Sequence, residues 1–273
     1  MSNYEAFGRL ESEGWSNSSR ASSYAALFAG AADHAINSLL NAVRAKAGDK
    51  ALDLCCGHGN VADALKARGC AVWGVDFSPA MLEMARERVP DAVFVEGNAQ
   101  DLPFEEEDFD VVVSNFGICH VADQQRALAE ACRVLRRNGR FAMTAWCGPD
   151  ESPCFELIYS AIKSHGSPEV SLPPGPDFHQ FAKSRTATDM LTGAGFSDVR
   201  LAVIDCFFDL DEPEHLCEIF EKATVRAAML LASQPSERLS AIRSALAATV
   251  RERFAHSGRW RVPVTAAMVS AQK

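Results

Sequence analysis

The chain has 273 residues, 48% of them hydrophobic, which is enough apolar material for one large domain or two small ones. Its 27 basic and 36 acidic side chains give a net charge of −9 with no dense Lys/Arg block, which argues against nucleic acid as a substrate. No apolar run approaches the roughly 20 residues of a membrane span, and no export signal opens the chain, so we expect a cytoplasmic protein whose nine cysteines are reduced.

Residues 1–49 are expected to form helices that act as an N-terminal lid. A polar, Ser-rich stretch comes first, and a helical pattern follows that places Ile36, Leu39, Leu40 and Val43 on one face. Gly48 and Asp49 end this helix.

Residues 50–146 alternate short apolar runs with helical stretches, which predicts a parallel sheet covered by helices on both faces. The expected strands are Ala51 to Leu54, Ala71 to Asp76, Ala92 to Glu96, Asp110 to Ser114 and Arg140 to Ala145. The expected helices are Val61 to Arg68, Pro79 to Val89 with Ser78 as N-cap, and Asp123 to Arg137 closed by Asn138-Gly139.

The pattern changes after Trp146, and we divide the remainder into four parts. The first part, residues 147–185, contains an inserted helix (Cys154 to Ser164) and a Pro-rich loop, and the second, residues 186–210, contains a core helix (Thr188 to Ala194) and a strand. The third part, residues 211–257, is a cap of two amphipathic helices, and the fourth, residues 258–273, is a final strand. The expected fold is therefore α/β and Rossmann-like, with a seven-stranded, mostly parallel sheet and an inserted helical cap.

A glycine-rich turn follows the first expected strand. Gly57 and Gly59 lie between that strand and a helix, so the backbone can approach a ligand closely where no Cβ intervenes. The next strand ends in Asp76, 23 residues after Asp53, a distance at which a carboxylate can bind both ribose hydroxyls of an adenosine. The pattern predicts a site for an adenosine cofactor.

Four ordered segments, at 52–59, 74–82, 96–104 and 109–116, resemble the class I S-adenosylmethionine-dependent methyltransferases. The resemblance is strongest to the branch that includes ubiquinone and menaquinone biosynthesis enzymes (methyltransferase type 11/25), and it covers most of the chain. It implies S-adenosyl-L-methionine as cofactor and S-adenosyl-L-homocysteine as product. It also implies methylation of oxygen, nitrogen or carbon on a small organic acceptor.

The resemblance also implies a role for individual residues. Asp53 and the backbone at Cys55 and Gly57 would hold the methionine end, and Asp76 would bind the ribose. The remaining implied contacts are Phe77 and Met81 flanking the adenine, Asn98 and Ala99 reading its edge, and Ser114 and Phe116 on the methyl-donor side. Two positions depart from the family, which usually has glycine at 55 and often aspartate at 98, so Cys55 must adopt a backbone angle tolerated without glycine.

Two other functions remain open on the sequence. The same turn fits Gly-x-Gly-x-x-Ala, so an NAD(P)-dependent oxidoreductase of Rossmann fold competes for the assignment. A non-catalytic S-adenosylmethionine-binding protein is the second alternative. We expect no metal, because Cys55, Cys56 and His58 lack the second ligand pair of a zinc site.

A histidine follows the fourth expected strand, at the edge of the sheet where ligands bind. This residue, His120, is the candidate general base, against the alternative of a structural loop histidine. His179, after the Pro-rich loop, is a second candidate, and Trp15 and Tyr24 are either packing aromatics or parts of the lid.

The acceptor is expected between the strand ends and the inserted segments. Their apolar residues suggest a partly hydrophobic small molecule: Phe155, Ile158, Phe178, Phe181, Phe220 and Met229. We expect a monomer or homodimer with a small-molecule acceptor, no nucleic acid and no membrane span.

Overall fold

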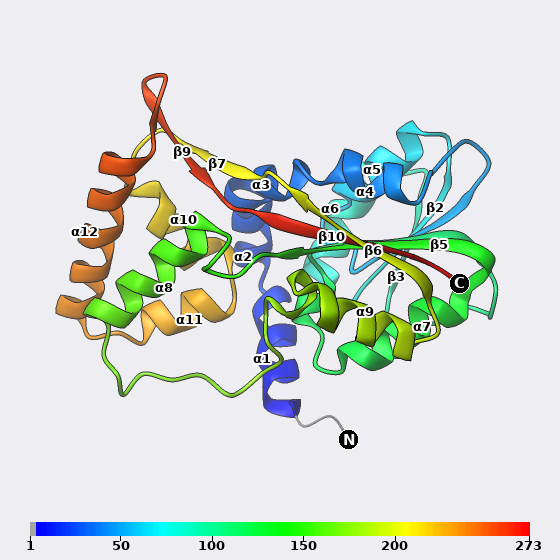
Figure 1. Cartoon of the computed structure of the whole chain (residues 1–273), viewed down its shortest axis with the longest axis horizontal. Coiled ribbons are helices and arrows are strands. Elements are labelled where there is room, and N and C mark those ends of the chain that lie inside the picture. Colours follow the sequence, from blue (N-terminus) through cyan, green and yellow to red (C-terminus); the bar gives the residue numbers. More distant parts are fainter. Residues whose placement is uncertain (1–3) are drawn as a thin grey trace.

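The computed structural model describes residues 4–273, so residues 1–3 of the expected lid lie outside the described part. The main sheet has seven strands in the order β3-β2-β1-β4-β5-β10-β6 (Figure 1). Their bounds are β1 Lys50–Leu54, β2 Ala71–Asp76, β3 Val93–Glu96, β4 Phe109–Asn115, β5 Leu135–Trp146, β6 Ser197–Ile204 and β10 Ala266–Gln272. Strands β1 to β5 are parallel, and β10 runs antiparallel to both β5 and β6. The predicted seven-stranded, mostly parallel sheet is confirmed.

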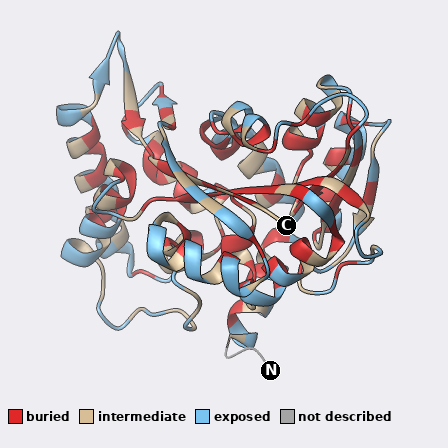
Figure 2. Ribbon diagram, turned by 45° about the vertical axis from the view of Figure 1, so that its right-hand side comes forward, coloured by how far each residue is buried: buried red, intermediate tan, exposed pale blue. Residues whose placement is uncertain are grey.

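Helices cover both faces of this sheet (Figure 1). One face packs against α4 (Ile36–Ala42), α5 (Asn60–Ala67) and α6 (Pro79–Arg88), and the other packs against α7 (Gln124–Val134) and α9 (Ser184–Gly193). The central strands read as nearly continuous apolar runs because both of their faces are buried, as Figure 2 shows for the middle of the sheet.

A cap lies beyond the carboxyl ends of the parallel strands, on the left of Figure 1. It contains α8 (Pro153–His165), α10 (His215–Ala223), α11 (Arg226–Ala232) and α12 (Ser236–Arg253). A second sheet in the order β7-β9-β8 completes it, formed by β7 Phe207–Leu210, β8 Ala255–His256 and β9 Arg259–Pro263. The cap has its own apolar core, to which α8, α10, α11, α12 and the strands β7 and β9 contribute.

The N-terminal segment forms helices that lie between the sheet and the cap in Figure 1. They are α1 Glu5–Trp15, α2 Ser18–Ser23, the π-helix η1 Tyr24–Phe28 and α3 Ala29–Asp33. Two short 3₁₀ turns complete the described elements, η2 Ile118–His120 and η3 Gln180–Ala182. None of the helices over residues 4–273 is both long and apolar enough to cross a membrane.

Three sequence expectations about elements are wrong. The helix expected up to Arg137 ends at Val134, because the following residues already pair: Asn138 N donates to the carbonyl of Lys273, and Lys273 N donates to Gly139 O, each at 3.1 Å. Asn138 therefore lies in β5, with φ of +62°, and does not close a helix.

The first of the two expected cap helices is divided into α10 and α11. Thr224 between them is extended, and its hydroxyl accepts a hydrogen bond from Ala228 N at 3.2 Å, which starts a new helix. The final strand expected over 258–273 is also divided, since Pro263 ends β9 in the cap sheet and β10 begins at Ala266 in the main sheet.

Candidate functional site

A cavity of about 380 Å³ opens where β1, β2, β4 and β5 end, between the main sheet and the cap. The sheet side of its wall includes Cys55, Gly57, Asp76, Phe77, Met81, Asn115, Phe116, Gly117, His120 and Trp146. The N-terminal helices add Glu11, Trp15, Tyr24 and Phe28, and the cap adds mainly apolar side chains. This is the edge of an open α/β sheet at which ligands bind.

The glycine turn forms one end of this cavity. Three residues of the turn have a positive φ: Cys55 at 59°, Gly57 at 52° and Gly59 at 83°. A Cβ at Gly57 would meet no atom within 4 Å, so this residue faces open space, whereas one at Gly59 would lie 3.0 Å from the Ala85 Cα of α6. The turn therefore presents bare backbone to the cavity while α6 packs closely behind it.

Cys55 adopts the left-handed conformation in which the family usually has glycine. Its Cβ packs against Gly117, where an added Cβ would be only 2.3 Å away. The small neighbour at 117 leaves room for the cysteine side chain, and burial raises the pKa of its thiol well above the usual range. Cys55 is therefore a neutral wall residue and not a reactive thiolate.

Asp76 joins the turn to the next helix. Its Oδ2 accepts from Gly57 N and its Oδ1 from Ser78 N, each at 2.9 Å. Ser78 in turn caps α6, since its Oγ accepts from Met81 N at 3.2 Å. Burial raises the pKa of Asp76 despite these hydrogen bonds, and the carboxyl group stays on the cavity wall with lone pairs free for a ligand.

Asp53 lies behind the turn and does not line the cavity. Its side chain is 1% exposed, and its Oδ2 has no hydrogen-bond partner among the described residues. Burial, with the nearby charge of Asp76, raises the pKa of Asp53 to about 8. A buried carboxyl group without a full set of partners is costly, and the contact of Asp53 with the cofactor stays a prediction.

A stacked aromatic pair forms part of the cavity wall. The rings of Phe116 and Trp146 lie 3.7 Å apart at an angle of 9°. Phe116 has φ of +57°, and its N–H donates to Thr144 Oγ1 at 2.9 Å, which holds this strained backbone in place.

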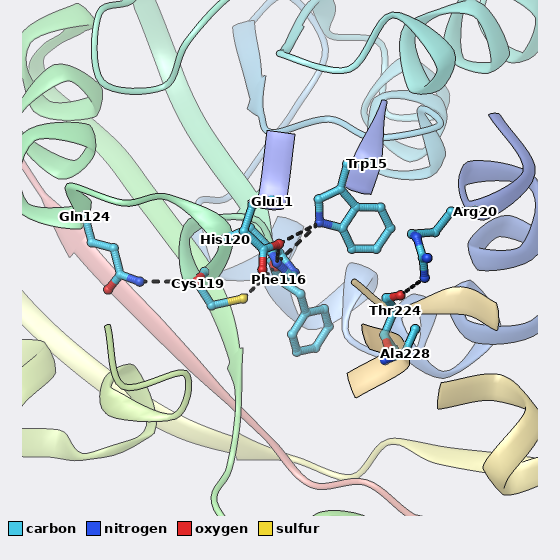
Figure 3. A network of polar contacts seen from close by, with 9 residues as sticks. All are labelled: Glu11, Trp15, Arg20, Phe116, Cys119, His120, Gln124, Thr224 and Ala228. Carbon is cyan, nitrogen blue, oxygen red and sulfur yellow. Dashed lines mark hydrogen bonds and ion pairs between the residues drawn. The ribbon is translucent and has the colours of Figure 1, made fainter. Parts of the chain in front are cut away.

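A buried polar network meets the cavity at the end of α1 (Figure 3). Glu11 Oε2 accepts from the indole N–H of Trp15 at 3.0 Å and from Nδ1–H of His120 at 2.8 Å. The indole nitrogen is also 3.4 Å from His120 Nδ1, but a protonated Nδ1 cannot accept. His120 lines the cavity, and the pKa of this imidazole is raised well above its usual range by Cys119 and Glu11, against the opposite effect of burial.

A family model and two solved structures match this chain, the model in sequence and the structures in fold. Residues 52–143 match a family model described as methyltransferase domain. The chain has the fold of the YcgJ protein of Bacillus subtilis, with a TM-score of 0.60 over 88% of this chain and 98% of that one at 18% identity. A putative methyltransferase from Bacillus halodurans gives 0.58 over 87% and 98% at 20% identity. The chain contains a class I S-adenosylmethionine-dependent methyltransferase domain.

Curated relatives match part of this chain. A demethylmenaquinone methyltransferase of Thermotoga maritima is 36% identical over 135 residues, 49% of this chain and 59% of that protein. A 2-phytyl-1,4-naphthoquinone methyltransferase of Trichormus variabilis is 41% identical over 115 residues, 39% and 50% of the two chains. The chain thus spans about half the length of the curated relatives it matches.

The fold brings most of the residues singled out from the sequence to one cavity. Cys55, Gly57, Asp76, Phe77, Met81, Phe116 and His120 line it, as do Trp15 and Tyr24. Asp53 and Ser114 lie just beneath: Ser114 is fully buried, its Oγ has no partner within the described residues, and it would be 3.0 Å from a Cβ at Gly117.

Two residues expected at the adenine edge lie outside the cavity wall. Asn98 is exposed, and its Oδ1 accepts from the backbone and side-chain nitrogens of Gln100, at 2.9 and 3.0 Å. Ala99 is 6% exposed, within the sheet core. Their contacts with adenine stay predictions.

His179 is not a free base, contrary to the sequence hypothesis. Its Nδ1–H donates to the carbonyl of Trp146 at 3.0 Å, and its Nε2 accepts from the hydroxyl of Tyr159 at 2.7 Å. Burial also lowers its pKa. Both ring nitrogens are therefore occupied, and the residue lies behind the cavity wall.

On the acceptor side, Phe155, Ile158, Phe178 and Phe220 line the cavity as expected. The other two expected residues do not: Phe181 is buried in the sheet core, and Met229 is 40% exposed. An apolar stripe on a helix is typical of a cavity wall and of a buried core alike, so the sequence pattern could not distinguish the two for Phe181 and Met229.

Sequence reasoning missed Glu11 and Arg226, which both line the cavity. Each is an ordinary charged residue on an amphipathic helix, so no local signal marks it. All nine cysteines are free thiols, and no group of three potential ligands for a metal occurs over residues 4–273.

Proposed function

We propose that this protein transfers a methyl group from S-adenosylmethionine to a small, ring-containing acceptor with a protonated nucleophile. The observation that carries the proposal is a single cavity. The backbone turn and Asp76 form one end, His120 and Phe116 lie along the wall, and aromatic side chains of the cap form the other end. Donor and acceptor would therefore meet away from water, which methyl transfer requires.

The sheet end of the cavity suits the cofactor. Asp76 would bind the ribose, Phe77 and Met81 the adenine face, and Asn98 and Ala99 its edge. The Gly57 and Cys55 backbone would hold the methionine end above Asp53, with Ser114 and Phe116 beside the sulfur. Gly57 facing open space and the unpartnered Oδ2 of Asp53 support this fit.

His120 would act as the general base. The cofactor, when bound, supplies an electrophilic methyl group and leaves as S-adenosylhomocysteine. Nε2 of His120 would take the proton of the acceptor hydroxyl or amine as the bond between that atom and the methyl carbon forms and the carbon–sulfur bond breaks. Glu11 would hold the ring in the required tautomer through Nδ1–H and stabilise the resulting imidazolium.

The acceptor class we infer is a fused-ring hydroxyaromatic compound of the naphthoquinol kind. The aromatic cap wall supports it, and the relatives named above are demethylmenaquinone and phytyl-naphthoquinone methyltransferases. The family model covers residues 52–143 and none of the cap, so the cap of this chain is free to select a different member of that class.

Calorimetry and a turnover assay test the proposal. S-adenosylhomocysteine should bind and NADH should not, and reversed results would favour the oxidoreductase. Formation of S-adenosylhomocysteine from S-adenosylmethionine with any naphthol, naphthoquinol or catechol of a small library would exclude a non-catalytic binding protein. Binding without turnover across such a library would overturn the enzymatic proposal.

Location and assembly also belong to this proposal. We place the protein in the cytoplasm as a monomer or homodimer that acts on no nucleic acid, supported by its net charge of −9. Light scattering after size-exclusion chromatography measures the oligomeric state, and a gel-shift titration with duplex and single-stranded oligonucleotides measures binding to nucleic acid.

A further inference from the structure

Arg226, the first residue of α11, is the only arginine or lysine among the described residues that line the cavity. Two carboxylates share the wall with it, but both are engaged elsewhere. Asp76 accepts from the glycine turn and from Ser78, and Glu11 accepts from Trp15 and His120. Within the described part of the chain, no carboxylate forms an ion pair with the Arg226 guanidinium.

The guanidinium is fixed in place on two sides. Its Nη2 donates to the carbonyl of Pro173 in the Pro-rich loop at 3.0 Å, and its central carbon lies 5.2 Å from the ring centre of Phe7 on α1. Its Nη1 is buried and has no hydrogen-bond partner within residues 4–273. A buried, positively charged donor without a partner is costly, and it implies an acceptor that binds there.

The position of Arg226 relative to His120 follows from α1. Phe7 contacts Arg226 and Glu11 contacts His120, and these α1 residues are four apart, so they lie on one helix face with Cβ atoms about 5–6 Å apart. Gly14, farther along α1, packs against Val225, where an added Cβ would be 2.5 Å from the valine side chain. The helix thus lies against the start of α11, and about one turn of α1 separates the contact with Arg226 from the contact with His120.

We propose that Arg226 is a carboxylate-binding subsite, and that the natural acceptor carries an acidic group about one ring away from its nucleophile. This inference rests on the proposed methyl transfer and narrows its acceptor. Guanidinium presents paired N–H groups that match the two oxygens of a carboxylate, and the surrounding aromatic wall strengthens this interaction by excluding water. A neutral, prenylated quinol has no group for this position.

The other carboxylate that could reach the cavity belongs to the methionine end of the cofactor. The turn that would hold this end lies at the carboxyl end of β1, whereas Arg226 belongs to the cap and is anchored to α1 and the Pro-rich loop. The two assignments differ in what Arg226 variants do to cofactor affinity, so one set of titrations separates them.

The test uses a matched pair of probes, 4-hydroxy-1-naphthoate, whose carboxylate lies across one ring from its hydroxyl, and 1-naphthol, titrated by calorimetry into the full chain with and without saturating S-adenosylhomocysteine. We expect the wild-type protein to bind the naphthoate at least tenfold more tightly than the naphthol. Arg226→Met, which keeps the apolar stem, should reduce this preference to twofold or less, and Arg226→Lys should leave an intermediate preference. Arg238→Met, which removes an exposed arginine of α12, is the matched control and should behave as wild type.

Three outcomes would overturn the subsite: no preference in the wild type, a preference that survives in Arg226→Met, or a tenfold loss of S-adenosylhomocysteine affinity in that variant. The last outcome would assign Arg226 to the cofactor. Thermal melting of each variant verifies that it is folded. The probe titrations need no turnover, so failure of the proposed methyl transfer shows separately, in the cofactor titration and the activity assay.

Discussion

The carboxylate of Glu11 lies 2.8 Å from Nδ1 of His120, although 109 residues separate them in the chain. The carboxyl group is only 2% exposed, and the indole of Trp15 donates to the same oxygen. The N-terminal helix therefore closes the cavity and orients the candidate base in one interaction. His120 itself lines the space where an acceptor would bind.

Replacement of Glu11 by Gln is expected to lower kcat by about 10-fold or more and to change its pH dependence. Glu11 and Cys119 raise the pKa of His120, so removal of the carboxylate lowers that pKa. Activity of a base rises as pH passes its pKa, and the acidic limb of the kcat profile should therefore move to lower pH in Glu11→Gln. A kcat profile from pH 5 to 10 measures both effects.

Glu11→Asp and His120→Ala provide the controls for this prediction. The aspartate keeps the charge and should retain the position of the acidic limb better than the glutamine. The double variant should be no slower than His120→Ala alone, because Glu11 acts through the histidine. A Glu11→Gln enzyme with slower turnover and an unchanged pH profile would reduce Glu11 to a structural role.

Asp76→Ala is expected to weaken S-adenosylhomocysteine binding by about 1 to 3 kcal/mol, since charge-assisted hydrogen bonds to the ribose are lost. Asp76 also accepts from Gly57 N and Ser78 N, so calorimetry must be combined with a thermal melt. Asp76→Asn preserves the shape and one acceptor oxygen, and it should lose less affinity. Wild-type affinity in the folded alanine variant would remove Asp76 from the cofactor site.

Gly57→Ala tests whether the bare backbone of the turn contacts the cofactor. Its φ of +52° makes an alanine there cost about 1 to 2 kcal/mol of stability, and the methyl group would occupy the open space of the cavity. We expect S-adenosylhomocysteine affinity to fall at least 10-fold. Gly48→Ala is the matched control, because Gly48 has φ of +88° and open space beyond it but lies away from the cavity wall. Equal effects of the two variants on affinity would contradict the assignment.

The fold of residues 50–146 could be predicted from the sequence because it depends on segments that are close together in the chain. A strand, a glycine turn and a helix must be adjacent in the chain to form a cradle, so the signal of Gly57, Gly59 and Asp76 lies within one short segment. The cap could not be predicted to the same depth. Its break at Thr224 depends on a hydroxyl that caps the next helix, and the division after Pro263 depends on pairing of β9 with β7, far away in the chain.

The charged residues of the cavity could not be predicted either, because their contacts also join segments that are far apart in the chain. Glu11 reaches His120 only because α1 folds back over the sheet, and Arg226 reaches the cavity only because Gly14 lets α1 lie against Val225. Such contacts join distant segments, and the hydrophobic pattern of either helix is compatible with many partners. A sequence thus reveals a cofactor turn more readily than the residues that select an acceptor.

Asp53→Asn is expected to remove a loss of stability that the wild-type protein shows at alkaline pH. The pKa of Asp53 is raised by burial to about 8, whereas an exposed aspartate has its pKa near 3.8. Because the folded state holds this proton more tightly than the unfolded chain, the stabilisation is fully present below the ordinary pKa and is lost as pH rises through about 8. From pH 6 to pH 9 the wild type should lose about 2 to 3 kcal/mol relative to Asp53→Asn.

Urea unfolding of the cofactor-free protein at both pH values measures this difference. Other groups, including the cysteines whose pKa burial also raises, titrate in both proteins and cancel in the comparison. Asp63→Asn, a change on a more exposed carboxylate of α5, is the control and should leave the pH dependence of the wild type intact. If Asp53→Asn and wild type lose the same free energy of unfolding between pH 6 and 9, then Asp53 is already ionised in the folded protein. In that case it would offer the cofactor a full negative charge instead of a neutral carboxyl group beneath the turn.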